Sequence, residues 1–79
     1  MFKAYVFINV DSGADSEVLQ ALGKLSNVKE AYEVYGVYDL LAKIESETME
    51  QLRDIVGARI RRLKKVKATV TLTEIQAKP

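Results

Sequence analysis

The middle of the chain reads Val34-Tyr35-Gly36-Val37-Tyr38-Asp39-Leu40-Leu41-Ala42-Lys43-Ile44. Gly36 has no Cβ atom and can adopt the positive φ that a tight turn requires. After the turn, Leu40, Ala42 and Ile44 alternate with other residues, which is typical of a strand with one buried face. We therefore predict a strand over 39–45, joined by a tight turn at 35–38 to a strand over 28–35. In that earlier strand, Val28, Tyr32 and Val34 are expected to share a face.

The N-terminal flank predicts a strand followed by a helix. Residues 2–10 alternate, and the expected apolar face consists of Phe2, Ala4, Val6, Ile8 and Val10. Apolar residues then recur at helical spacing from Val18 to Leu25, which predicts an amphipathic helix over 13–25. Asp11 or Ser12 is expected to cap this helix, because both side chains can accept a hydrogen bond from its first amides.

The C-terminal flank repeats this helix–strand order. Thr48 followed by Gln51 is the pattern of a capping box, and an apolar stripe runs from Leu52 to Leu63. Residues 66–75 then alternate as a strand. With right-handed crossovers, the order βαββαβ predicts an α+β, ferredoxin-like sandwich. In this fold a four-stranded antiparallel sheet carries both helices on one face.

Composition limits the kinds of site that the chain can hold. Its 79 residues make one domain, 1–79, without a cysteine or a histidine. Disulfides, thiolate nucleophiles and Ser-His-Asp sites are therefore excluded. The formal net charge of +1 gives no strong field toward nucleic acid or membranes. The chain has no apolar run long enough to span a bilayer and no signal-peptide pattern, so we expect a cytoplasmic protein. We also expect no cofactor.

One face of the predicted sheet has no helix to cover it. Its expected residues are Tyr5, Phe7, Tyr35, Leu41, Thr71 and Thr73. Scattered surface aromatics would be ordinary. Self-association across a twofold axis explains the pattern better, because so small a core contributes only about 3–5 kcal/mol and benefits from a partner. We predict a homodimer with Tyr5, Phe7, Tyr35, Leu41 and Thr73 in its interface.

The turn at 35–39 has two interpretations. In the structural one, Gly36 serves the hairpin and Asp39 accepts hydrogen bonds from turn amides. In the functional one, the turn is a small polar pocket, where backbone amides bind a carboxylate and Asp39 binds an ammonium group.

The same hairpin resembles the Gly-x-Tyr-Asp-Leu motif of the effector-binding domain of the Lrp/AsnC family, often called the RAM domain. Three further segments are similar to that family in the same order: Leu25-Ser26-Asn27-Val28, the helix end Ile60-Arg61-Arg62-Leu63-Lys64-Lys65-Val66, and Val66-Lys67-Ala68-Thr69-Val70-Thr71. The resemblance covers nearly the whole chain. The sequence starts directly at the first strand, so it resembles the stand-alone form without a helix-turn-helix domain.

The resemblance implies dimers that pair through their sheets and assemble into larger rings, octamers or decamers. It implies that an amino acid or similar small effector binds in clefts between dimers. By position, the ligand-binding residues are Gly36, Val37, Tyr38, Asp39, Thr69 and Thr71. It also implies a role in transcription by co-assembly with full-length Lrp/AsnC regulators, with no direct DNA binding and no membrane contact. Tyr35 stands where smaller residues are common in the family, so the ligand itself is left open.

A small dimeric ferredoxin-like enzyme, of the monooxygenase or isomerase type, is the main alternative. It would need a cavity inside one protomer and a group that transfers protons. The available groups are Asp39, Glu33, Tyr32 and Tyr38, and none has a basic partner at a fixed spacing. We therefore predict no catalytic residues, and the position of the cavity distinguishes the two interpretations.

A basic cluster ends the second predicted helix. It consists of Arg59, Arg61, Arg62, Lys64, Lys65 and Lys67. Nucleic-acid binding is one interpretation, but no aromatic residue interleaves the cluster to stack on bases. Complementing the helix dipole explains it without a ligand. Glu45, Glu47 and Glu50 offer oxygen atoms without a calcium loop, so no metal site is predicted.

Overall fold

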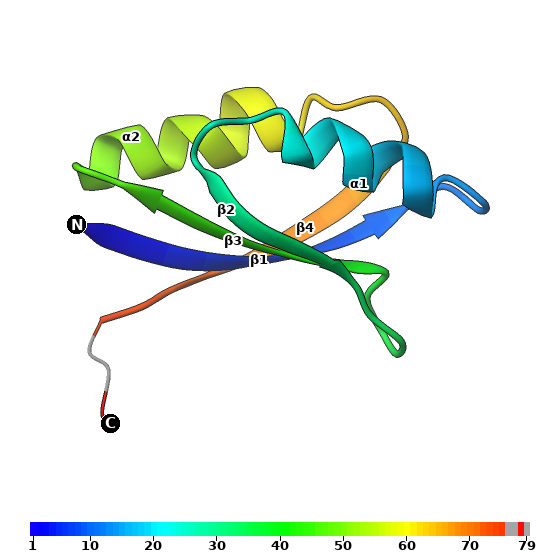
Figure 1. Ribbon diagram of the computed structural model, residues 1–79, viewed down its shortest axis with the longest axis horizontal. Helices are drawn as coiled ribbons and strands as arrows, with labels where there is room; N and C mark the ends of the chain where they lie inside the picture. The colour runs from blue at the N-terminus through cyan, green and yellow to red at the C-terminus, as the bar shows by residue number, and fades with distance from the viewer. Residues whose placement is uncertain (76–77, 79) are drawn as a thin grey trace.

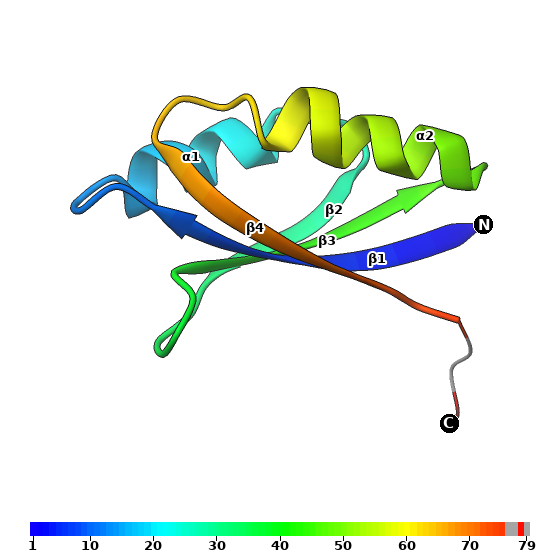
Figure 2. The ribbon, with the colours of Figure 1, turned by 180° about the vertical axis from the view of Figure 1, so that it is seen from behind.

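The computed structural model describes residues 1–75 and 78. The elements follow in the order β1 (Phe2–Val10), α1 (Asp15–Gly23), β2 (Val28–Glu33), β3 (Leu40–Ser46), α2 (Met49–Asp54), η1 (Ile55–Ile60) and β4 (Val66–Thr73). The strands form one four-stranded antiparallel sheet in the order β2-β3-β1-β4. Both helical segments lie on the same face of this sheet (Figures 1 and 2). The predicted ferredoxin-like fold is confirmed.

The core lies between the sheet and the helices. The central strands β1 and β3 bury every second residue, and Val6 and Ile8 pair with Ala42 and Leu40 across the ladder. The predicted faces of these two strands are thus confirmed, although Phe2 remains 40% exposed. The helices cover this face with fully or nearly fully buried side chains: Val18, Leu22, Leu52, Ile55 and Ile60.

Helix α1 begins later than its predicted cap. Its N-cap is Ala14, and no side chain caps it. Gly13 adopts a φ of +80°, and the Ala14 amide donates to the Asp11 carbonyl over 3.0 Å. This turn moves the first helical residue beyond the reach of Asp11 and Ser12, so the prediction that either side chain caps the helix is wrong.

The second helix widens in its C-terminal half. It begins as predicted, because Thr48 Oγ1 accepts a hydrogen bond of 3.0 Å from the Gln51 amide. Within the π-helical turn η1, the Arg61 amide donates to the Val56 carbonyl over 2.9 Å. A regular α-helix would turn Arg59, four residues after the buried Ile55, toward the core. The wide turn instead buries Ile60 completely and leaves Arg59 exposed, so a charge stays out of the core.

Strand β2 contains a bulge at Lys29. Val28 pairs with Ile44, whereas Glu30 already pairs with Lys43. The extra residue places Val28 on the helix side and Tyr32, opposite Leu41, on the other side. The prediction that Val28, Tyr32 and Val34 share a face is therefore wrong. β2 also ends at Glu33, which leaves Val34 in the following loop.

Strand β4 turns its threonines toward the helices. Thr69, Thr71 and Thr73 pair with Ile8, Val6 and Ala4, which all lie on the buried face. Thr71 and Thr73 are therefore not on the uncovered face, and that prediction is wrong. Alternation alone could not decide the side, since both sets of residues suit a strand; the pairing register with β1 decides it.

Candidate functional site

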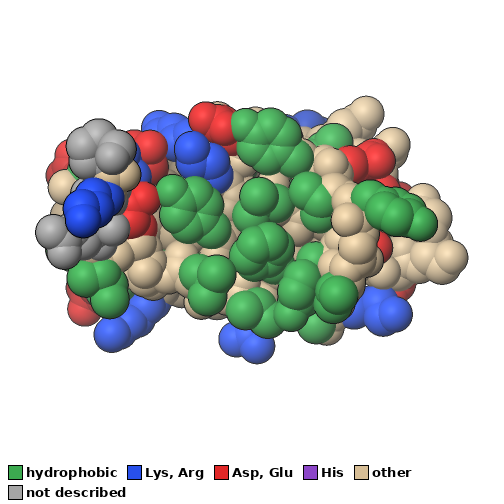
Figure 3. Space-filling model, turned by 90° about the horizontal axis from the view of Figure 1, so that it is seen from below, with side chains coloured by type: hydrophobic (Ala, Val, Ile, Leu, Met, Phe, Trp, Pro, Cys, Tyr) green, Lys and Arg blue, Asp and Glu red, His purple; other side chains and the backbone are tan. Residues whose placement is uncertain are grey.

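An apolar surface covers the side of the sheet opposite the helices. We call it the open face: Tyr5, Phe7, Tyr32, Leu41, Val70 and Leu72. Hydrophobic side chains gather across its middle (Figure 3). Leu72, Tyr32 and Val70 are 54%, 46% and 41% exposed. Tyr5, Phe7 and Leu41 are placed as the sequence predicted, whereas Tyr32, Val70 and Leu72 were missed because their sides depend on the register.

Polar contacts border this apolar surface. Lys43 lies 3.6 Å from the Glu30 carboxylate and 5.8 Å from the centre of the Tyr5 ring. The Tyr32 hydroxyl donates to Glu30, and the Tyr5 hydroxyl donates to Glu74 over 2.8 Å. The hydrogen bond from Tyr32, with the nearby Lys43 charge, lowers the pKa of Glu30. The bond to Glu74 raises the pKa of Tyr5. At the margin of the open face, Glu30 thus accepts a hydrogen bond from Tyr32 and pairs with Lys43.

Acid is expected to weaken the contacts of Glu30 at the margin of the open face. Because the folded protein lowers the pKa of Glu30 from its ordinary 4.5, the carboxylate stabilises the fold above that pH. Its contribution is lost as the pH falls through the lowered pKa. Melting temperatures measured from neutral to acid pH should show Glu30→Gln below the parent at neutral pH, with the gap closing in acid. Glu33→Gln, on the same strand, is the control; equal profiles for Glu30→Gln and the parent would contradict this assignment.

The loop between β2 and β3 runs from Val34 to Asp39. It projects from the sheet on the side away from the helices (Figure 1). Gly36 adopts a φ of +148°, which confirms the predicted positive φ. The tip carries Tyr35, which is fully exposed, and Val37, which is 84% exposed. Tyr35 therefore lies in the loop rather than on a strand of the open face. Two large apolar side chains at a loop tip have no partner within the described residues.

Asp39 ties this loop to β1. Its Oδ2 atom accepts a hydrogen bond of 2.9 Å from the amide of the buried Val10, and its own amide donates to the Ile8 carbonyl over 3.0 Å. Asp39 does accept a hydrogen bond from a backbone amide, as the structural interpretation predicted. That amide, however, belongs to β1 and not to the turn. The neighbouring Tyr38 ring packs 5.3 Å from the centre of the Phe7 ring, which connects the loop to the open face.

The ligand-binding residues predicted by resemblance form two groups in one protomer. Gly36 and Val37 lie at the loop tip, whereas Thr69 and Thr71 face the helix side of β4. The main cavities lined by described residues do not include Gly36–Asp39. None of these cavities contains residues from both groups.

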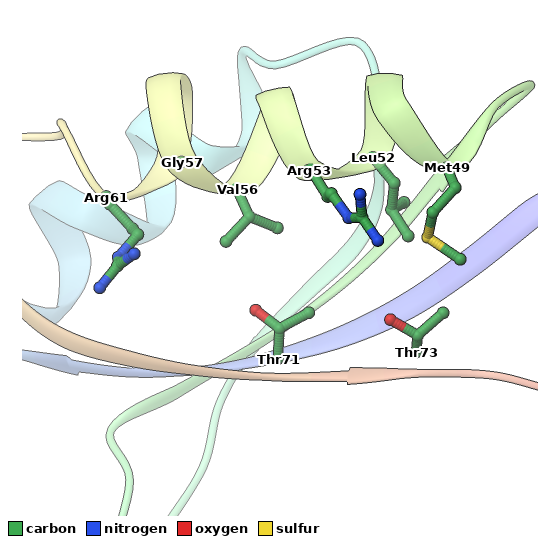
Figure 4. Close-up of a pocket in the computed structure, with 8 residues that line it drawn as sticks. All are labelled: Met49, Leu52, Arg53, Val56, Gly57, Arg61, Thr71 and Thr73. Atoms are coloured by element: carbon green, nitrogen blue, oxygen red, sulfur yellow. The ribbon is translucent and has the colours of Figure 1, made fainter.

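One of the cavities of the protomer lies between the second helix and β4. It has a volume of about 320 Å³ and is lined by Met49, Leu52, Arg53, Val56, Gly57, Arg61, Thr71 and Thr73 (Figure 4). We call it the α2–β4 groove. Sequence reasoning missed it, because the groove depends on how far the helix stands from the edge strand.

The enzyme interpretation requires a cavity within one protomer and a group that transfers protons, and the α2–β4 groove provides only the cavity. Its lining holds no aspartate, glutamate or tyrosine, and arginine does not give up its proton in proteins. Asp39, Glu33, Tyr32 and Tyr38 are absent from it. This arrangement can bind an anion, but its lining has no side chain suited to accept or donate a proton.

The residues of the basic cluster have different surroundings in the structure. Lys65 forms an ion pair with Glu17 at 2.8 Å, a contact that raises the pKa of Lys65, while Arg61 turns into the α2–β4 groove. Within residues 1–75 and 78, no group of three acidic side chains is placed to hold a metal ion. In the same part of the chain, no helix has both the length and the apolar character needed to cross a bilayer.

Other proteins are similar to this chain in sequence or in fold. The HTH-type transcriptional regulator FL11 of Pyrococcus furiosus is 38% identical over 58 residues, in a match that covers 70% of this chain and 38% of the regulator. The matched segment thus covers well under half the length of the curated relatives. TTHA0845 from Thermus thermophilus superimposes with a TM-score of 0.94 at 34% identity, covering 100% of this chain and 99% of that one.

FFRP-DM1 superimposes with a TM-score of 0.92 at 35% identity, covering 95% of this chain and 100% of that chain. A family model described as the Lrp/AsnC ligand binding domain matches residues 3–77. This domain occurs in transcriptional regulators, which indicates a regulatory role rather than an enzymatic one. The match includes the hairpin, both helical segments and all four strands, and the chain belongs to the Lrp/AsnC ligand binding domain family.

Proposed function

We propose that this protein is a regulatory assembly module that binds a small amino-acid effector between its dimers. The dimers form through the open face and join into an octameric or decameric ring. The module acts on transcription by co-assembling with full-length Lrp/AsnC regulators and does not bind DNA itself. It works in the cytoplasm and without a cofactor.

The orientation of β4 is the main support for a dimer formed through the open face. An edge strand of a monomer gains most by turning its apolar side chains toward its own helices. β4 does the opposite: Val70 and Leu72 point away from the helices, and Thr71 and Thr73 point toward them. A second open face across a twofold axis would bury Val70 and Leu72 together with Phe7. Thr73 has no place in such an interface.

The effector site follows from the division of the ligand-binding residues. The loop between β2 and β3 projects away from the helices, whereas Thr69 and Thr71 face the helix side of β4, so we infer that contact between dimers brings the loop tip and the threonines together. Backbone amides near Gly36 would bind the carboxylate of an amino acid, and Asp39 its ammonium group. A carboxylate accepts several hydrogen bonds, so the bond from Val10 to Oδ2 leaves Asp39 with acceptor capacity.

Co-assembly rests on the same surface. A full-length regulator with this domain presents an equivalent sheet face, so mixed pairs are geometrically permitted. The net charge of +1 gives the isolated chain little attraction for phosphate, and no helix-turn-helix motif occurs among the residues described here. Any effect on DNA would therefore pass through the partner regulator.

A thermal-shift screen of the common amino acids tests the effector. A ligand that binds only the assembled state stabilises it by about 2.7 kcal/mol at a hundredfold excess over Kd. For a domain of this size, each kcal/mol raises the melting temperature by roughly 4–8 °C. We expect one or a few amino acids to give a clear shift.

Asp39→Asn is the matched variant for this screen, because it keeps an acceptor oxygen for the Val10 amide and removes the charge that binds ammonium. The response should disappear in this variant. A full response from Asp39→Asn would place the site elsewhere. If no amino acid shifts the parent protein at millimolar concentration, the effector part of the proposal fails.

A further inference from the structure

The second helix has an outer side that no other element of the described chain covers (Figures 1 and 2). Four exposed residues recur there at intervals of four, along the helix and just past its end: Glu50, Asp54, Ala58 and Arg62. Glu50 precedes the buried Leu52 by two residues, and Ala58 stands in the same relation to Ile60. Since two residues are about half a helical turn, these four residues point away from the core. We call them the outer stripe; none of them lines the α2–β4 groove.

The outer stripe is acidic at one end and basic at the other. Glu50 and Asp54 come before Ala58, and Arg62 comes after it. The ion pairs found among the described residues use none of these three charges. The charges of the outer stripe are therefore open to a partner from outside the chain.

The helix dipole explains only part of this arrangement. Its effect is confined to the first and last turns of a helix, whereas Asp54 is the last residue of α2, where the helix continues directly into η1. Asp54 also stands four residues after Glu50, and like charges at this spacing repel each other on a helix. A positive charge supplied by a partner would offset this repulsion.

The outer stripe is complementary to a second copy of itself. When two stripes meet antiparallel with Ala58 at a twofold axis, Asp54 lies four residues to one side of the axis and Arg62 four residues to the other. Each Asp54 then faces the partner's Arg62, and the same contact is made twice. A carboxylate and a guanidinium can join through two parallel hydrogen bonds. The small side chain of Ala58 lets the two helices approach each other closely.

We propose that the outer stripe is the surface through which the open-face dimers join one another, by pairing antiparallel with the outer stripe of a second copy. The open face and the outer stripe lie on opposite sides of the chain, so each chain holds one neighbour on each side (Figures 1 and 2). Alternation of the two contacts links the dimers into a ring. This inference rests on the open-face dimer of the proposed function. It involves neither the effector residues nor the α2–β4 groove.

Salt provides the first test, because the charges of the outer stripe are exposed and a surface ion pair is screened by salt. Light scattering coupled to size exclusion should show the parent protein as larger than two chains in low salt. In about 1 M salt, where the Debye length is about 3 Å, it should return to two chains. An assembly of unchanged mass in both conditions, or a parent that never exceeds two chains, would overturn the outer-stripe contact.

A charge swap provides the second test. Arg62→Asp places a carboxylate opposite each Asp54 and should weaken the association between dimers about tenfold. The double variant Asp54→Arg/Arg62→Asp restores opposite charges and should assemble like the parent. Lys24→Asp makes the same change of charge at an exposed position of the other helix, and it should also assemble like the parent. A double variant that assembles no better than Arg62→Asp would refute the pairing, and circular dichroism checks each fold.

The two contacts can be lost separately. In about 1 M salt, Arg62→Asp should remain a two-chain dimer, whereas Phe7→Lys should be a single chain, because only Phe7 lies in the open face. This pair of results supports both contacts. A two-chain dimer that Arg62→Asp separates and Phe7→Lys leaves intact would instead refute the open-face dimer, and with it the assembly proposed here.

Discussion

Replacing Phe7 with lysine is expected to separate the proposed open-face dimer into monomers. Phe7 lies in the middle of the open face, paired with Leu41 on one side and Val70 on the other. In a twofold interface the new charge would be buried without a partner twice per dimer. Each uncompensated buried charge costs about 3–5 kcal/mol, and 1.4 kcal/mol is a factor of ten in affinity. Dimer affinity should therefore fall by at least about a thousandfold.

Light scattering coupled to size exclusion at micromolar concentration measures this change. The monomer itself should stay folded, since Phe7 is only half-buried and its ring contact is with the neighbouring Tyr38. Circular dichroism checks the fold, and Leu72→Lys provides a second variant at a more exposed position of the same face. Gln20→Lys adds the same charge on the exposed surface of α1 and should leave the dimer intact. A dimeric Phe7→Lys protein, or a monomeric parent, would refute the open-face dimer.

Asp39→Ala is expected to lower the melting temperature substantially, even without a ligand. The substitution removes the acceptor of the Val10 amide, and Val10 is only 5% exposed. A buried donor left without a partner costs about 1–3 kcal/mol. With roughly 4–8 °C for each kcal/mol in a domain of this size, the change is large enough to measure by thermal denaturation.

The Asn variant separates the structural role of Asp39 from ligand binding. Asp39→Asn keeps an oxygen at the acceptor position, so it should melt closer to the parent than Asp39→Ala does. Equal melting temperatures for Asp39→Ala and the parent would show that the bond to Val10 contributes nothing to stability.

Each part of the fold that was predicted correctly has a strong local pattern in its sequence. β1 and β3 are central strands, so their alternation of buried and exposed residues is unambiguous and indicated the correct faces. The Thr48–Gln51 cap is a local motif that needs no tertiary information. These segments, with Gly36, were sufficient to predict the ferredoxin-like order.

The features that were not predictable depend on contacts between distant segments. β4 has residues suited to a strand on both faces, and only its pairing with β1 shows that Thr71 and Thr73 lie beneath the helix. The bulge at Lys29 reverses the expected side of Tyr32. The α2–β4 groove depends on the spacing of two elements that are not neighbours in the sequence, so no local pattern marks its residues.

The wide turn η1 also bears on how this chain should be aligned with its relatives. An i→i−5 turn holds one residue more than the α-helical turn that it replaces. Loss of one residue between Ile55 and Ile60 would restore regular α-helical geometry while the apolar stripe still faced the sheet. For a relative that is one residue shorter here, the correct alignment therefore has its gap inside the helix and not in an adjoining loop. Loss of a single residue from this turn is therefore compatible with the same packed core.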